Sequence, residues 1–260
     1  MQRHTIVVLG IITLLVGCGG GGSSSSNTSN PTPATTPQST VGHAQGVYSG
    51  TTSSNTAFET IVLPNDSFYG IYGTLSGNVL LVDGMVAGQG TSGSTTFTAT
   101  VNDFLFTGAV TPGSINANYV AASSISGTLS EAGSPTVSFS GTAIPASQFN
   151  YNTAASLSQI SGSWIGTLLD GSTATVNISS SGSFTGSNSG CSFSGMIAPD
   201  SSGKNFFNIT MTFGASPCLR PGQSASGVAV DYLLSNGVNR QLLAGLTSGN
   251  AFGSAFVATR

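Results

Sequence analysis

The stretch Gly46-Val47-Tyr48-Ser49-Gly50-Thr51 recurs 116 residues later as Gly162-Ser163-Trp164-Ile165-Gly166-Thr167. The same offset pairs Phe68 with Phe184, Gly70 with Gly186 and Phe97 with Phe213, and a slightly smaller one pairs Tyr119 with Tyr232 and Phe139-Ser140-Gly141 with Phe252-Gly253-Ser254. A fixed period of Gly and aromatic positions indicates a duplicated structural unit. We therefore predict two domains, at residues 45–147 and 156–260, joined by residues 148–155.

Each half has the pattern of β-strands rather than helices. Thr173-Ala174-Thr175-Val176-Asn177-Ile178 alternates small or apolar residues with polar ones, and turn signals such as Asp170-Gly171 and Asn236-Gly237 separate the runs. The second half divides into about eight such runs, and the first half divides similarly. Because closure removes exposed sheet edges, we predict an all-β chain of two tandem eight-stranded antiparallel up-and-down β-barrels. A pair of β-sandwiches is the alternative.

The first 17 residues have the features of an export signal. An apolar run from Ile6 to Val16 follows a short basic start and is too short to serve as a membrane anchor. It ends in Leu15-Val16-Gly17-Cys18, which resembles the lipobox of bacterial lipoproteins. The alternative is an ordinary secretory signal followed by a chance cysteine.

The lipobox resemblance implies that the chain is cut before Cys18 and that this residue receives a diacylglyceryl group and a further acyl chain such as palmitate. Two or more acyl chains anchor a protein stably, whereas one does not. Gly19 stands where this family uses Asp for inner-membrane retention, so the resemblance implies the outer membrane, on either its periplasmic or its surface side. Residues 18–44 are rich in Gly, Ser, Thr and Pro, which predicts a flexible, disordered tether.

The start of the second half carries a further resemblance. Gly162-Ser163-Trp164, followed by Gly182-Ser183-Phe184-Thr185-Gly186, resembles the opening of avidin-type and lipocalin-type barrels. Trp164 is the one Trp of the chain, so the biotin pocket of avidins, which needs several, is not implied. A lipidated Cys, a tether and barrel domains are also similar in plan to surface lipoproteins of the transferrin-binding and factor-H-binding type, without implying their host partners.

The composition excludes several classes of protein. Charged residues are 5% of the chain, the formal net charge is −3, and Lys and Arg number five, which argues against a nucleic-acid binder. After removal of the signal the single His is His43, in the tether, so the folded halves lack an imidazole for a catalytic triad or a His-based zinc site. Lys204 lies in a turn sequence and is not expected to act as a base. We predict no metal, no cofactor and no enzyme activity.

The acidic residues could support glycoside cleavage only as a pair of carboxylates. Glu59, Asp103 and Asp231 fall within or beside predicted strands, and we expect them to face solvent. The first half holds five acids and neither Lys nor Arg. This imbalance is interpreted either as an acidic face for a partner or as drift in a surface made soluble by Ser and Thr.

Cys191 and Cys218 form an even pair in a compartment that permits disulfides, so we predict a disulfide between them. For function, we predict a non-catalytic binding module that presents its loops to an unknown protein or glycan. The alternatives are a lipocalin-like carrier, in which a barrel holds a small apolar ligand, and a structural envelope lipoprotein. The sequence identifies no ligand-binding residue.

Overall fold

The protein is described here by a computed structural model that covers residues 43–77 and 79–260. The predicted signal peptide (1–17), the lipidation site Cys18 and the tether up to residue 42 lie outside the described residues. Among the residues described, no helix has the length and apolar character needed to cross a membrane.

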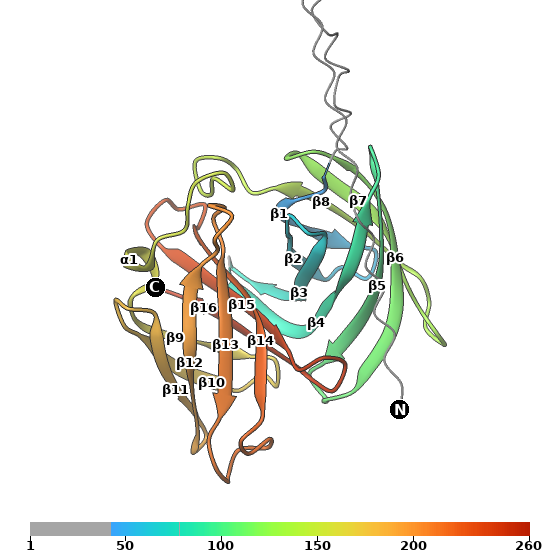
Figure 1. The fold of residues 1–260 in the computed structure, drawn as a ribbon. Helices are drawn as coiled ribbons and strands as arrows, with labels where there is room; N and C mark the ends of the chain where they lie inside the picture. Colours follow the sequence, from blue (N-terminus) through green and yellow to red (C-terminus); the bar gives the residue numbers. More distant parts are fainter. Residues whose placement is uncertain (1–42, 78) are drawn as a thin grey trace, which may run out of the picture. The chain divides into compact units, whose positions relative to one another are not determined.

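The described chain forms sixteen antiparallel strands in two closed barrels (Figure 1). The first barrel consists of β1 (Gly46–Thr52), β2 (Ala57–Val62), β3 (Ser67–Ser76), β4 (Val79–Ser92), β5 (Thr96–Leu105), β6 (Val110–Val120), β7 (Ser124–Glu131) and β8 (Val137–Ala143). The second consists of β9 (Gly162–Leu168), β10 (Thr173–Ile178), β11 (Ser183–Asn188), β12 (Cys191–Pro199), β13 (Phe207–Phe213), β14 (Ser224–Leu233), β15 (Arg240–Thr247) and β16 (Gly253–Thr259).

Each strand pairs with its neighbours in sequence, and the first strand of each barrel pairs with the last. Gly50 of β1 lies opposite Gly141 of β8, and Gly166 of β9 lies opposite Ala258 of β16. These pairings close the two sheets and leave neither with a free edge. The prediction of two eight-stranded up-and-down barrels is confirmed, and the alternative of two sandwiches is wrong.

The duplication is visible in matching contacts at the first strand of each barrel. The Tyr48 hydroxyl donates a hydrogen bond to the carbonyl oxygen of Ala44 at 2.9 Å. The Trp164 indole N–H donates one to the carbonyl oxygen of Ile160 at 2.7 Å. Both aromatic side chains are fully buried, and both reach the residue four positions earlier. The predicted equivalence of Tyr48 and Trp164 therefore has a structural basis.

Three of the residue pairings expected from the repeat are wrong. Tyr119 points into the first barrel, whereas Tyr232 points outward from the second, so the counterpart of Tyr119 is its neighbour Asp231. Phe97 is the second residue of β5, whereas Phe213 is the last residue of β13; the residue that begins β13 is Phe207. Phe139 lies two residues from the Gly141 that faces Gly50, so its counterpart is Phe256 rather than Phe252. The cause is strand length, because β3 and β4 have 10 and 14 residues and β11 and β12 have 6 and 9.

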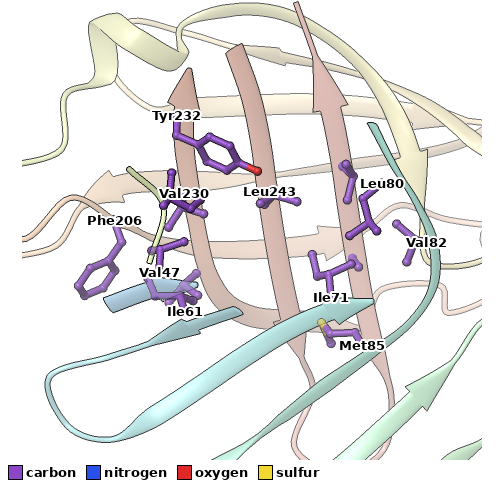
Figure 2. Packing of buried hydrophobic residues seen from close by; sticks show 14 of the residues in the cluster. Val47, Ile61, Ile71, Leu80, Val82, Met85, Phe206, Val230, Tyr232 and Leu243 are labelled. Carbon is purple, nitrogen blue, oxygen red and sulfur yellow. The ribbon is translucent and has the colours of Figure 1, made fainter. Parts of the chain in front are cut away.

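The two barrels pack together through an apolar cluster formed by their outward-facing side chains. Because side chains alternate across a strand, one face of β1 to β4 lines the interior of the first barrel and the other contacts β14 to β16. Figure 2 shows this cluster, which includes Val47, Ile61, Ile71, Leu80, Val82, Met85, Phe206, Val230, Tyr232 and Leu243. The described residues, from 43 onward, accordingly belong to one compact unit.

The connection between the barrels is also packed. Phe149 is buried in the cluster between the barrels, and Ala155 is buried in the interior of the second barrel. A one-turn helix, α1 (Leu157–Ile160), then leads into β9. At the same end of the first barrel, just before β1, the buried Ala44 donates its N–H to the Ser92 hydroxyl at 3.0 Å.

Candidate functional site

The interior of the first barrel contains a cavity of about 230 Å³. Inward-facing residues from all eight strands line it, and most of them are aromatic or aliphatic. The apolar part of the lining includes Phe58, Val62, Phe68, Val86, Phe97, Ile115, Ile125, Leu129, Val137 and Phe139. An apolar cavity of this kind, with a few polar groups that converge on it, is the usual form of a small-molecule site.

The cavity is closed at one end of the barrel and reaches solvent at the other. At the closed end Tyr48, Phe97 and Tyr119 are buried in one cluster, and the Tyr119 hydroxyl donates to the carbonyl oxygen of Gly93 at 2.6 Å. At the opposite end the lining extends to Ser54, an exposed residue in the turn between β1 and β2. A ligand would therefore enter past this turn.

Three polar side chains meet on the wall of the cavity nearer the open end. The Tyr72 hydroxyl of β3 donates to the two carboxylate oxygens of Asp103 on β5, at 3.0 and 2.9 Å. Glu131 of β7 also lines the cavity beside Asp103. Asp103 itself is 5% exposed.

Two glycines on the strands beside this cluster make room for it. A Cβ atom on Gly84 would lie 2.1 Å from the Tyr72 hydroxyl oxygen, and one on Gly113 would lie 3.0 Å from Cγ of Glu131. The side chains of Tyr72 and Glu131 therefore lie over Gly84 and Gly113, which have no side chain that would clash with them. Any larger residue at position 84 would displace the Tyr72 ring.

The environment favours the protonated form of Asp103. Burial, with the negative charge and hydrogen bonding of Glu131, raises the pKa of Asp103 to about 7, although the hydrogen bond from Tyr72 acts in the opposite direction. Burial and the charge of Asp103 also raise the pKa of Tyr72, so this phenol stays protonated. Oε1 of Glu131 is buried and has no hydrogen-bond partner. The cluster thus has unused capacity to accept a hydrogen bond.

The expectation that Glu59, Asp103 and Asp231 face solvent is wrong, because each is held in a buried contact. A signal for Asp103 was present in the alternation of β5, where Phe97, Ala99 and Val101 point inward and Asp103 follows at the same spacing. The carboxylate in this position interrupts an apolar series, which is typical of a functional or paired group.

Asp231, in the second barrel, is paired with a cation. Its carboxylate is bound by the Arg240 guanidinium, whose Nε lies 2.9 and 3.1 Å from the two oxygens. Burial raises the pKa of Asp231, and the hydrogen bonds and charge of Arg240 oppose that effect. The interior on this side is filled by large side chains, among them Trp164, Phe184, Phe193 and Phe207.

Glu59 faces outward from the first barrel and forms a polar contact with the second. The Gln241 amide donates to its two carboxylate oxygens at 3.0 and 2.9 Å, and the Tyr232 hydroxyl donates to Oε2. Burial raises the pKa of Glu59, and these hydrogen bonds oppose the effect. This contact fixes the register of one barrel against the other and does not reach the cavity.

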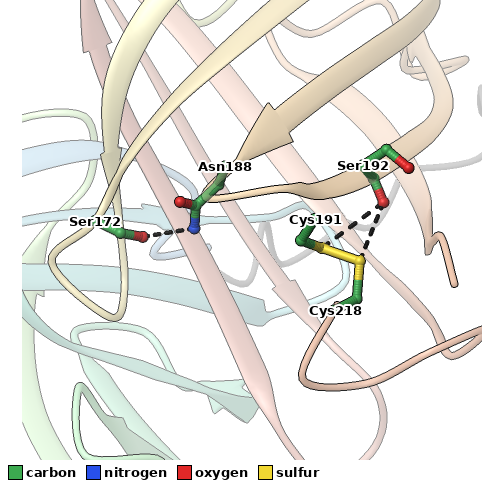
Figure 3. The surroundings of a disulfide bond; sticks show 5 residues. All are labelled: Ser172, Asn188, Cys191, Ser192 and Cys218. Atoms are coloured by element: carbon green, nitrogen blue, oxygen red, sulfur yellow. Dashed lines mark hydrogen bonds between the residues drawn. A yellow bond between two sulfur atoms is a disulfide. The ribbon is translucent and has the colours of Figure 1, made fainter. Parts of the chain in front are cut away.

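A second hollow, of about 420 Å³, lies where one end of the second barrel meets the turn between β5 and β6. The Arg220 guanidinium lies 4.3 Å from the centre of the Phe252 ring in its wall, and Phe106 and Leu219 border it with 59% and 91% of their surface exposed. The predicted disulfide between Cys191 and Cys218 is present beside this hollow (Figure 3).

The remaining predicted site residues are placed as follows. Cys18, the expected lipidation site, lies outside the described residues. His43 is exposed, with Nδ1 3.9 Å from the Asp66 carboxylate. Lys204 binds the side-chain oxygen of Asn152 at 2.8 Å. Within residues 43–77 and 79–260, no group of three or more His, Cys, Asp or Glu could hold a metal ion.

No protein-family model matches the chain, and no curated protein matches it. A solved structure with a detectable likeness is that of the isotype 1 transferrin binding protein B from serogroup B Neisseria meningitidis, at 11% sequence identity and a TM-score of 0.26. The match covers 80% of this chain and 63% of that one, so this chain spans less than two thirds of its length.

Proposed function

We propose that this protein is a non-catalytic binding lipoprotein whose first barrel holds a small, largely apolar ligand in its interior. The observation that carries the proposal is the cavity of about 230 Å³, which is lined by aromatic side chains and reaches the exposed turn at Ser54. An eight-stranded barrel is just wide enough either to fill itself with side chains or to hold one small ligand. The first barrel leaves part of its interior free of side chains, as a barrel that holds a ligand must.

The proposal includes attachment to the bacterial outer membrane through acylated Cys18 and the tether that follows it. The lipobox sequence at residues 15–18 supports this part. The tether would hold the barrels close to the lipid surface, where apolar small molecules partition. Mass spectrometry of the native protein should show loss of residues 1–17 and acylation of Cys18, and an intact Met1 would contradict it.

The proposal excludes catalysis by the carboxylates of the cavity. Asp103 and Glu131 interact directly with each other. Glycosidases instead separate their two carboxyl groups by at least about 5 Å so that the scissile bond lies between them. The pair is better suited to bind a polar group than to bracket a reacting bond.

The test is to fill the cavity and measure ligand binding. Leu129→Trp places an indole in the lumen, and binding of a small apolar probe such as propylbenzene should fall at least about tenfold, since the site no longer has free volume. Leu75→Trp is the matched control, because Leu75 is 52% exposed on β3. Ile115→Phe provides a milder filling variant if Leu129→Trp unfolds.

The proposal would be overturned if wild-type protein does not bind the probe in calorimetry, or if the filling variants Leu129→Trp and Ile115→Phe, when folded, bind it as wild type does. Thermal unfolding of each variant identifies those that have lost their fold.

A second candidate is the interaction module that binds a protein or glycan through its loops. It is favoured by one observation, the exposed Phe106 and Leu219 at the border of the 420 Å³ hollow. If this face binds the functional partner, Phe106→Ser with Leu219→Ser would abolish that binding and leave probe binding in the first barrel unchanged.

A further inference from the structure

We propose that the ligand of the first barrel carries an amine and that Asp103 and Glu131 receive its ammonium group. This inference rests on the proposed function and adds the chemical class of the ligand. It starts from the polar part of the cavity wall, where two carboxyl groups and one phenol stand in an otherwise apolar surface.

The hydrogen-bonding capacity of the cluster defines what the ligand must supply. The Tyr72 hydroxyl is used as a donor to Asp103, and Oε1 of Glu131 is buried without a partner. Carboxylates accept hydrogen bonds, so a ligand group that binds this oxygen must bring a donor. A buried acceptor left unpaired is costly, and a ligand that brings a donor removes that cost.

The charge of the surroundings favours a cationic donor. The sequence has no Lys or Arg between residues 4 and 203, so the first barrel has no cation of this kind to pair with Asp103 and Glu131. Two adjacent carboxylates in an apolar wall repel a second anion and attract a cation. The four aromatic rings of Phe58, Phe68, Phe97 and Phe139 supply the apolar contact for the rest of the ligand.

The volume limits the size of the ligand. An apolar cavity of about 150 Å³ holds benzene. The cavity of about 230 Å³ therefore suits about nine non-hydrogen atoms. Phenethylamine has this size and places one ammonium group at the end of an aromatic body, and propylbenzene is its neutral counterpart.

The experiment compares three probes by isothermal titration calorimetry at pH 8: phenethylamine, propylbenzene and the anion phenylacetate. We expect phenethylamine to bind about tenfold to a hundredfold more tightly than propylbenzene, because hydrogen bonds to charged groups are among the strongest. Phenylacetate should bind more weakly than both.

Variants test whether the two carboxylates cause the preference for phenethylamine over propylbenzene. In the double variant Asp103→Asn with Glu131→Gln, phenethylamine should lose its advantage and propylbenzene should bind at least as well as to wild type. Asp83→Asn removes one negative charge from an exposed position on β4 and should keep the advantage. If the double variant unfolds, the single variant Glu131→Gln, which keeps the contact of Tyr72 with Asp103, replaces it.

The outcomes separate this inference from the proposed function. Equal binding of phenethylamine and propylbenzene by wild type, or tighter binding of phenylacetate, would overturn the amine preference and leave the apolar site in place. An amine preference that persists in the folded double variant would also overturn it. Failure of all three probes to bind would overturn both the inference and the function on which it rests.

Discussion

The two barrels share strand number, connectivity and a matching aromatic contact in their first strands. They differ in the partners of the carboxylate that each holds in its interior. In the second barrel Asp231 is bound by Arg240 and large side chains fill the interior. In the first barrel Asp103 contacts a phenol and another carboxyl group, and the interior is open. The difference is that the buried carboxylate of the second barrel is paired with a cation, whereas that of the first barrel lies beside a cavity without one.

Among the substitutions that test this difference, we expect the largest change in stability from one in the second barrel. Arg240→Met leaves Asp231 buried without its cation and should lower the free energy of unfolding by about 3–5 kcal/mol. Arg220→Met is the control, because Arg220 contacts the Phe252 ring and forms no ion pair among the described residues. Urea unfolding measures both variants. Adding Asp231→Asn to Arg240→Met should restore part of the loss, and no restoration would contradict the role of the pair.

The disulfide is a second asymmetry, since it links two residues of the second barrel. Replacing Cys191 and Cys218 by Ser should lower the free energy of unfolding by about 3–4 kcal/mol, because the bond closes a loop across 27 positions of the chain. Probe binding in the first barrel should stay unchanged at temperatures where the variant is folded. A loss of probe binding by folded protein would contradict the independence of the two interiors.

In the first barrel a substitution in the acidic cluster should stabilise the protein. The pKa of Asp103 is raised from its ordinary value of 3.8 to about 7, so the folded chain holds a proton that the unfolded chain has lost between these pH values. Stability from this residue therefore decreases as the pH rises from 4 to 7. Asp103→Asn removes this cost and should raise the free energy of unfolding at pH 8 by about 2–4 kcal/mol.

The same substitution should have a much smaller effect on stability at pH 4, where the folded state is protonated and the unfolded state has lost only part of its proton. Urea unfolding at pH 4 and pH 8 tests this difference. An equal change at both pH values would show that packing, rather than the buried charge, explains the result.

The smallest expected effect is the pH dependence of amine binding. The titratable groups that face Asp103 are Tyr72 from β3 and Glu131 from β7. Because an ammonium prefers the ionised carboxylate, affinity for phenethylamine should rise about tenfold from pH 6 to pH 8, as Asp103 loses its proton. Binding at pH 7 should accordingly release protons to the buffer, which calorimetry in buffers of different ionisation enthalpy detects. The dependence should disappear in Asp103→Asn, and its persistence there would assign it to another group.

Much of the fold follows from short-range patterns in the sequence. Alternating residues, turn signals and the repeated Gly-x-aromatic stretch predict sixteen strands in two barrels, because each of these features reports local backbone geometry. The turn signals Asp170-Gly171 and Asn236-Gly237, for example, fall between β9 and β10 and between β14 and β15. The error in pairing Phe97 with Phe213 arose because strand lengths differ between the halves, which a gapless offset does not represent.

The site was harder to predict than the fold. The sequence predicts that the carboxylates of Glu59, Asp103 and Asp231 face solvent, because the pattern of a single strand does not indicate which other element covers it. Burial of Glu59 comes from the other barrel, and the open lumen depends on which interior side chains extend and which are glycine. These properties come from contacts between residues far apart in sequence.

The central claim is that the first barrel encloses a ligand-sized apolar cavity, whereas large side chains occupy the second barrel around Trp164 and leave a hollow only at one end. Crystals equilibrated with xenon under pressure test it directly, because dry apolar cavities take up xenon. We expect a xenon peak among Phe58, Phe97 and Phe139 and none inside the cluster around Trp164. An empty first barrel, or xenon inside the cluster around Trp164, would contradict the account.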